Sequence, residues 1–111
     1  MTPVLKAITA RVALESLEID EVSETLVVPR STITIIGTTV NVKGDVDISD
    51  KDLTKIPYKF GTVIGSFKCF NNNLTSLEGA PLKVGGDFYC ANNPGSKNFV
   101  KPLGVKGKFV K

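Results

Sequence analysis

The first hydrophobic pattern along the chain has helical spacing. Val4, Leu5, Ile8 and Val12 recur on one face of a helix, while polar side chains cover the other face. This pattern predicts a helix over residues 3–17. Acidic residues are frequent in the stretch that follows, up to residue 24, and indicate a polar connection.

From residue 25 the composition changes to the β-branched type that is typical of strands. Residues 25–28 and 31–36 are rich in valine, isoleucine and threonine, with a proline and an arginine between them. Gly37 interrupts the pattern, and residues 38–42 resume it in alternation. We therefore expect two or three short strands in this region, with a hairpin as one arrangement of them.

A 21-residue repeat begins at Val42. The same positions recur in four aligned segments, residues 42–48, 63–69, 84–90 and 105–111. The third position of each segment is a glycine: Gly44, Gly65, Gly86 and Gly107. The fifth position is hydrophobic: Val46, Phe67, Phe88 and Phe109. A fixed period of this length is the signature of a solenoid, in which each coil repeats one structural unit.

These patterns together predict an α+β fold in a single domain. Residues 42–111 are expected to form a short solenoid, with one short parallel strand in each 21-residue coil. Residues 1–41 are expected to form a cap of one helix and short strands. A chain of 111 residues is long enough to bury a core without metals or disulfides.

The best-formed copy of the repeat, Phe67-x-Cys69-x-x-Asn72-x-Leu74-x-x-Leu77, resembles a short leucine-rich repeat. Residues 42–111 are more similar still to small proteins of tailed bacteriophages, which contain Asn-Asn-Leu-Thr-Ser-Leu-Glu-Gly-x-Pro and Val-x-Gly-Asp-Phe-x-Cys units. The resemblance implies a phage accessory or structural protein. It also implies that Asn72, like its counterpart in leucine-rich repeats, bonds backbone groups inside the turn.

Some copies depart from this pattern. Lys51 stands in the first copy where Asn72 and Asn93 stand in the next two. The third copy has Pro94 and Gly95 in place of the Asn-Leu step, and Asn98 in place of the second leucine. We therefore expect a less regular coil after about residue 93.

Side chains alternate in direction along a strand, so the repeat also predicts which positions face outward. If Phe88 and Cys90 point inward, three outward rows run across the coils. The rows are Lys43, Ile64, Gly85 and Lys106; Asp45, Ser66, Asp87 and Lys108; and Asp47, Lys68, Tyr89 and Val110. Opposite charges are neighbours within two of these rows, which predicts the ion pairs Asp47–Lys68 and Asp87–Lys108.

Solenoid sheets of this type commonly serve as protein-binding surfaces. Aromatic side chains dominate the energetics of such surfaces, so Phe70 and Tyr89 are the predicted anchors. The full set of candidate partner-binding residues is Ile64, Lys68, Phe70, Asp87, Tyr89, Lys106 and Lys108. A surface that binds nothing in particular is the alternative.

Few groups suited to catalysis or metal binding are present. The sequence has no histidine, which removes the commonest general base and zinc ligand. Cys69 and Cys90 share one inward position a coil apart and are expected to be reduced core thiols. A cluster of four aspartates, at positions 45, 47, 50 and 52, lacks the glycine and glutamate of an EF-hand loop. We expect no catalytic residue, metal or cofactor, with calcium binding or acid–base chemistry at this cluster as the alternatives.

The charge distribution is asymmetric although the net charge is only +3. Residues 1–50 carry four basic and eight acidic side chains, whereas residues 51–111 carry ten and three. A basic C-terminal end is able to contact phosphates or an acidic protein surface, although solvated termini are often charged in this way.

No apolar run reaches the roughly 18 residues that span a bilayer, and no signal-peptide pattern opens the chain. A cytoplasmic protein is expected, and the phage resemblance implies the cytoplasm of a bacterial host.

Three functions are consistent with these observations. The first is a non-enzymatic protein-binding module, which binds and inhibits a host or defence protein. The second is a virion or assembly component whose copies join through an open coil edge at residues 105–110. The third is nucleic-acid binding through the basic C-terminal end, which lacks an aromatic platform. The expected partner is a host or phage protein, with no membrane involvement.

Overall fold

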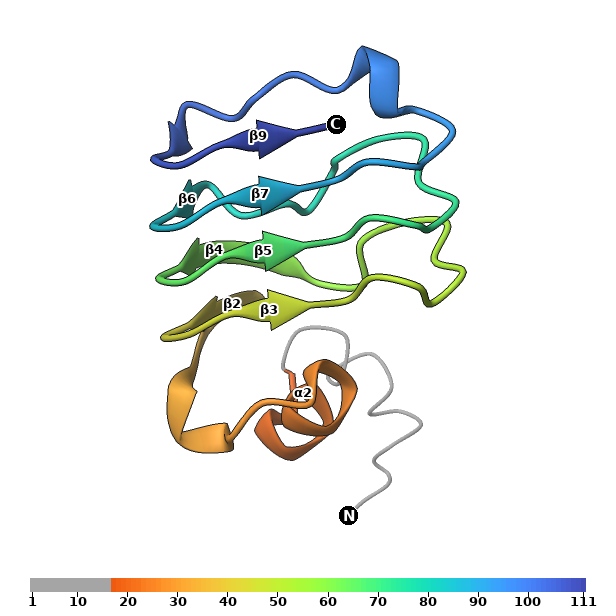
Figure 1. Ribbon diagram of the computed structural model, residues 1–111. Helices are drawn as coiled ribbons and strands as arrows, with labels where there is room; N and C mark the ends of the chain where they lie inside the picture. Colours follow the sequence, from red (N-terminus) through yellow and green to blue (C-terminus); the bar gives the residue numbers. More distant parts are fainter. Residues whose placement is uncertain (1–16) are drawn as a thin grey trace.

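The repeat stacks its coils along one axis in the computed structural model, which describes residues 17–111 (Figure 1). The described part forms a β-solenoid with a helix at its N-terminal end, and it measures 43 × 27 × 21 Å. Parallel strands pair at an offset of 21 residues, for example Phe67 with Phe88 and Val63 with Val84. The α+β class and the 21-residue parallel register are therefore confirmed.

Each coil contributes two short strands to two separate sheets, so the prediction of one strand per coil is wrong. Sheet A has the order β1 (Ile33–Ile36), β2 (Thr39–Val42), β4 (Lys59–Val63), β6 (Lys83–Val84) and β8 (Gly104–Val105). Sheet B has the order β3 (Val46–Asp47), β5 (Phe67–Lys68), β7 (Phe88–Tyr89) and β9 (Phe109–Val110). The segment between them, such as residues 64–66, turns a corner, so one apparent strand in the sequence is divided between the two sheets.

The N-terminal end of the solenoid is covered by α2 (Ile19–Leu26) (Figure 1). Its side chains Val22 and Leu26 are buried against the core, while the acidic residues of the helix face solvent. The helix ends at Val27, which has a left-handed φ of 53°. The predicted polar connection up to residue 24 and the strand at 25–28 are therefore wrong, because the apolar positions pack at helical spacing. The predicted helix over residues 3–17 lies almost wholly outside the described residues.

A hairpin joins the helix to the solenoid. After a short 3₁₀ turn, η1 (Arg30–Thr32), strand β1 pairs antiparallel with β2. Gly37 lies in the connecting turn with a φ of 66°, a conformation that glycine adopts without steric cost. The strands predicted at 31–36 and 38–42 are confirmed to within two residues, and the hairpin is the arrangement that forms.

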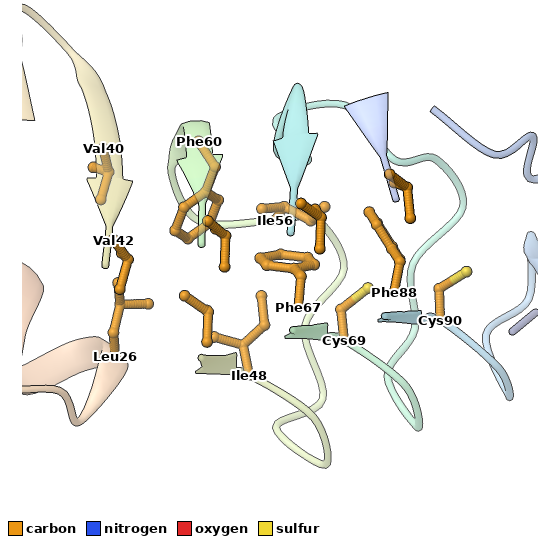
Figure 2. Close-up of a cluster of buried hydrophobic side chains, with 14 of the residues drawn as sticks. Leu26, Val40, Val42, Ile48, Ile56, Phe60, Phe67, Cys69, Phe88 and Cys90 are labelled. Carbon is orange, nitrogen blue, oxygen red and sulfur yellow. The ribbon is translucent and has the colours of Figure 1, made fainter. Parts of the chain in front are cut away.

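The core is a continuous column of hydrophobic side chains between the two sheets (Figure 2). Phe60, Phe67, Phe88 and Phe109 stack along it, with successive ring centroids 5.2, 5.2 and 5.3 Å apart. Cys69 and Cys90 lie one above the other beside this column, as predicted (Figure 2). Aromatic contacts at these distances add to the stability that burial provides.

The last coil departs from the others between residues 94 and 103, as its altered sequence predicts. A 3₁₀ turn, η2 (Ser96–Asn98), replaces the regular bend, and Phe99 becomes the buried residue that closes the core. The register is nevertheless restored at β8, where Gly104 pairs with Lys83. The irregular segment therefore changes the outline of this coil without changing the stacking.

Candidate protein-binding surfaces

The asparagines of the repeat are structural, as the resemblance implies. The Asn72 side chain lies in the bend after β5, where its Oδ1 accepts hydrogen bonds from the backbone N–H groups of Lys51 and Leu53, both at 3.0 Å. Its Nδ2 donates to the carbonyl oxygen of Ile48 at 2.9 Å. Asn93 repeats this arrangement one coil later. Both side chains are buried, and they satisfy backbone groups in the bend, including the buried carbonyl groups of Ile48, Cys69 and Cys90.

A second row of side chain–backbone bonds runs along the corner between the sheets. Asp45 Oδ1 accepts the N–H of Ser66 at 2.8 Å, and Ser66 Oγ accepts the N–H of Asp87 at 3.0 Å. Asp87 Oδ1 then accepts the N–H of Lys108 at 2.8 Å. Each polar side chain therefore bonds the residue that occupies its own repeat position in the next coil.

This corner row explains the repeat glycines. A Cβ atom on Gly65 would lie 2.1 Å from Asp45 Oδ1, and one on Gly107 would lie 2.2 Å from Asp87 Oδ1. Gly44 lies in the first copy of the repeat, where no aspartate of a preceding coil lies beside it. A Cβ atom there would meet nothing within 4 Å. The glycine leaves room for the carboxylate or hydroxyl that bonds the next amide.

The predicted ion pairs Asp47–Lys68 and Asp87–Lys108 do not form. Within the described residues, 17–111, the ion pair that is present joins Arg30 to Asp20 at 3.1 Å. The Lys108 N–H and the Tyr89 hydroxyl donate to Asp87, and these bonds lower the pKa of its carboxyl group. Burial acts to raise the pKa of Asp47, but hydrogen bonds from Ser49 and the nearby charge of Lys68 outweigh it, so the net shift is downward. Asp87 is therefore bonded to a backbone amide of the next coil, and Asp47 to Ser49 of its own coil, in place of the lysine ammonium groups.

The predicted aromatic anchors lie on the outer side of sheet B and just beyond it. Phe70 and Tyr89 are half-buried, and the Tyr89 hydroxyl donates to Asp87 Oδ2 at 3.0 Å. This bond and the adjacent negative charge raise the pKa of Tyr89. Lys68 Nζ lies 6.0 Å from the centre of the Tyr89 ring, which is the outer limit of a cation–π contact. These side chains form a fixed face whose polar atoms are already partly bonded.

The other predicted residues lie elsewhere, at the corner of the coils. Ile64 and Lys106 line a hollow of about 390 Å³ with Lys83 and Leu103, away from Lys68, Phe70 and Tyr89. Lys108 is exposed at the end of the corner row. The structure therefore divides the predicted set among the sheet B face, the corner row and the corner hollow, whereas the sequence analysis placed it on one surface.

Sequence reasoning missed two exposed hydrophobic side chains: Leu103, which lines the hollow beside Ile64, and Leu82, which adjoins Leu103. Leu103 is fully exposed and Leu82 is 69% exposed, while Ile64 is 58% exposed. Leu82 and Leu103 are adjacent in register, because they immediately precede the paired residues Lys83 and Gly104. We call Ile64, Leu82 and Leu103 the corner patch. The sequence signal that could have identified Leu82 and Leu103 is a leucine at the same repeat position in two successive coils.

The titratable groups of the described region offer little chemistry. Burial raises the pKa of the Cys69 thiol to about 12 and that of Cys90 to about 11, so both are unreactive thiols at neutral pH. Within residues 17–111 no group of three or more carboxylate or cysteine side chains is arranged to hold a metal ion. The aspartate cluster at positions 45–52 is not arranged in this way either. Within it, Asp45 accepts a hydrogen bond from Ser66 and Asp47 accepts one from Ser49.

No helix in the part of the chain that the structure describes is long and apolar enough to cross a membrane. Comparison of the chain with protein-family models, curated proteins and solved structures found no match.

Proposed function

We propose that this chain is a non-enzymatic protein-binding module whose principal contact surface is the corner patch. The observation that carries the proposal is the exposure of Ile64 and Leu103, which line one hollow, and of Leu82, which is adjacent to Leu103 in register. Contiguous apolar side chains on a folded surface cost free energy in water, and such patches commonly mark interaction sites.

The Leu82 side chain is exposed along the side of the solenoid and not at an open end of the coil stack. Leu82 has a coil on each side of it, since β6 pairs with both β4 and β8, and it is still 69% exposed. Stacking a coil against its neighbour therefore does not cover this position. A protein partner is able to bury Leu82 and Leu103 together.

The backbone beneath the patch is rigidly connected. Leu82 donates its N–H to the carbonyl oxygen of Gly61 at 2.8 Å, and Gly85 donates to Val63 at 2.9 Å. The corner row adds the Ser66–Asp87 bond between the same two coils and the Asp87–Lys108 bond to the next coil. A surface that is already ordered loses little conformational entropy on binding, which favours recognition.

Two features support a function without catalysis. The chain has no histidine, and its cysteines are buried with raised pKa values. The polar residues of the repeat, including Asn72 and Asp87, bond backbone groups of neighbouring coils. They are therefore committed to structure.

The resemblance of residues 42–111 to leucine-rich-repeat-like phage proteins narrows the partner that we propose. It favours a host or defence protein in the bacterial cytoplasm, which this chain would bind and inhibit. Two further observations support the repeat assignment: the constant 21-residue register and the backbone-bonding role of Asn72 and Asn93.

Site-specific photo-crosslinking tests the proposal. A benzophenone amino acid is placed at Leu82 or Leu103, and each variant is irradiated in a bacterial lysate. We expect one discrete adduct from both positions. Val27 and Ile36, which are 79% and 68% exposed, are the control positions because they are hydrophobic and lie outside the patch. Absence of an adduct, or the same adducts from the control positions, would contradict a binding function of the corner patch.

A further inference from the structure

The corner hollow owes its shape to two glycines that the stacking requires. A Cβ atom on Gly85 would lie 2.2 Å from the carbonyl oxygen of Ile64, and one on Gly104 would lie 1.9 Å from that of Leu82. Neither position can therefore carry a side chain without moving the backbone of the adjacent coil. The hollow is a fixed consequence of coil stacking and is present before any partner binds.

The rim of the hollow carries positive charge without a counter-charge. Lys83 and Lys106 both line it, and none of its lining residues is acidic. Neither lysine has a carboxylate partner within ion-pair distance among the residues that the structure describes. An apolar floor between two unpaired ammonium groups is complementary to an apolar side chain flanked by carboxylates.

The size of the hollow limits its occupant. A volume of about 390 Å³ is near the lower end of the range for small-molecule sites, roughly 300–1,000 Å³. One leucine or phenylalanine side chain fills a substantial part of such a space. Ile64 and Leu103, which both line the hollow, would then contact this side chain, while Leu82 adds exposed apolar surface next to Leu103.

A second copy of this chain is a poorer occupant than another protein. The acidic residues of α2 are exposed, but the hydrophobic residues of that helix, Val22 and Leu26, are buried. Val27 is the exposed hydrophobic residue beside these acids, and Arg30 three residues later would bring a like charge toward the lysines. Asp20 is also already paired with Arg30.

We infer that the corner hollow binds an acidic segment of another protein, with one large apolar side chain inserted between Ile64 and Leu103 and flanking carboxylates at Lys83 and Lys106. This inference rests on the proposed function and specifies the chemistry of the partner at the same site. It explains why exposed leucines and unpaired lysines are found at one corner of the solenoid.

A peptide titration of the full chain tests the inference. The probe is the acetylated, amidated peptide Gly-Glu-Glu-Leu-Glu-Glu-Gly, added to isotope-labelled protein and followed by the NMR signals of its backbone amides. We expect the amides of Gly85, Gly104 and Lys106 to shift. Replacing the central leucine of the peptide by glycine, or its glutamates by glutamine, is expected to weaken binding roughly tenfold in each case.

Charge reversal in the protein gives the matched comparison. The double variant Lys83→Glu/Lys106→Glu is expected to weaken peptide binding roughly tenfold. The control Lys55→Glu/Lys59→Glu makes the same charge change at two exposed lysines that line a different hollow, and it should leave the affinity within about twofold. Both variants alter exposed side chains, and their free spectra report whether the fold is intact.

Several results would overturn the inference. Equal affinity for the leucine and glycine peptides would show that the peptide binds through charge alone. Equal weakening by the two charge-reversal variants would show that the peptide responds to the overall charge of the protein and not to Lys83 and Lys106. Shifts caused by an oligothymidine or by laurate, but not by the peptide, would assign the hollow to another ligand class. Dimerisation in light scattering that Lys83→Glu/Lys106→Glu abolishes would assign it to a second copy. A failed peptide titration with intact crosslinking at Leu103 would reject the acidic segment and leave the proposed function standing.

Discussion

At the scale of single residues, the polar side chains of this solenoid serve mainly to bond backbone groups of the neighbouring coil. Asn72 and Asn93 do so in the bends, and Asp45, Ser66 and Asp87 do so at the corner. Because each bond joins equivalent positions in adjacent coils or spans nearly one repeat, these residues hold the 21-residue register. Their loss should therefore affect stability more than any surface property.

Replacement of Asn72 by alanine tests this role. The substitution leaves the amides of Lys51 and Leu53 and the buried carbonyl of Ile48 without their partner. We expect the free energy of unfolding in urea to fall by about 3 kcal/mol. Asn73→Ala is the matched control, because Asn73 is exposed and its side chain bonds no described residue; a change of at most about 0.5 kcal/mol is expected there. Similar losses in the two variants would contradict the assignment.

The lowered pKa of Asp87 predicts a pH dependence with a defined sign. The folded pKa lies below the unfolded value of about 3.9, so the ionised carboxylate stabilises the fold above that pH. This stabilisation is lost as the pH falls through the folded pKa. Asp87→Asn keeps an oxygen for the Lys108 amide, and we expect its urea midpoint to fall less between pH 6 and pH 2 than that of the wild type. Asp47, whose pKa is also lowered, supplies residual dependence.

The control for this measurement is Asp52→Asn, because Asp52 is exposed and accepts no hydrogen bond from a described residue. Its acid sensitivity should match that of the wild type. If Asp87→Asn is as acid-sensitive as Asp52→Asn, the corner bond does not hold the carboxylate in its ionised form.

At the scale of elements, the sequence predicts the coil better than it predicts the strands within the coil. The inward positions at Phe67, Phe88, Cys69 and Cys90 follow directly from the 21-residue spacing, and all four are buried. The division of each segment between two sheets was missed because strands of two residues are too short to show alternation. Helix α2 was missed because β-branched residues at its end obscured the helical spacing of its apolar positions.

The repeat glycines give a prediction at this scale. The same glycine-to-alanine change should have different effects on stability at two equivalent repeat positions. Gly65→Ala places a Cβ atom 2.1 Å from Asp45 Oδ1 and 2.8 Å from the Gly44 backbone, and we expect unfolding to become easier by about 2–3 kcal/mol. Gly44→Ala, at the same repeat position, meets nothing within 4 Å and should change stability by at most about 0.5 kcal/mol. Chemical denaturation measures both. Equal losses would show that the glycines are required for backbone freedom and not for close stacking.

At the scale of the whole molecule, the continuous aromatic column and the bonds between coils should make the solenoid unfold as one unit. The cysteines report on this, since both lie inside the stack with pKa values raised to about 12 and 11. We expect a thiol reagent at pH 8 to label neither cysteine of the native protein rapidly, and both to become reactive together across the urea transition. Rapid labelling of Cys90 in buffer would indicate that the last coil opens independently.

The candidate site was only partly accessible from the sequence. Ile64 and Lys106 were assigned to the surface correctly, but their neighbours Leu82, Lys83 and Leu103 depend on a second sheet that the repeat does not reveal. Hydrophobic residues in a repeat are ordinarily assigned to the core, and only the path of the chain shows that these two leucines point outward. The nature of a partner depends on groups outside this chain, so it was argued from the chemistry of the hollow.

The central claim is that the corner patch is where this protein binds its partner. The most direct measurement is the dissociation constant for the protein captured by crosslinking at Leu103, with the double variant Leu82→Asp/Leu103→Asp compared with Val27→Asp/Ile36→Asp. All four positions are exposed in the folded chain. Affinity should fall roughly thirtyfold or more in the corner variant, the loss typical of a binding hot spot, and stay within about twofold in the control. Equal affinities of the two variants would contradict the claim.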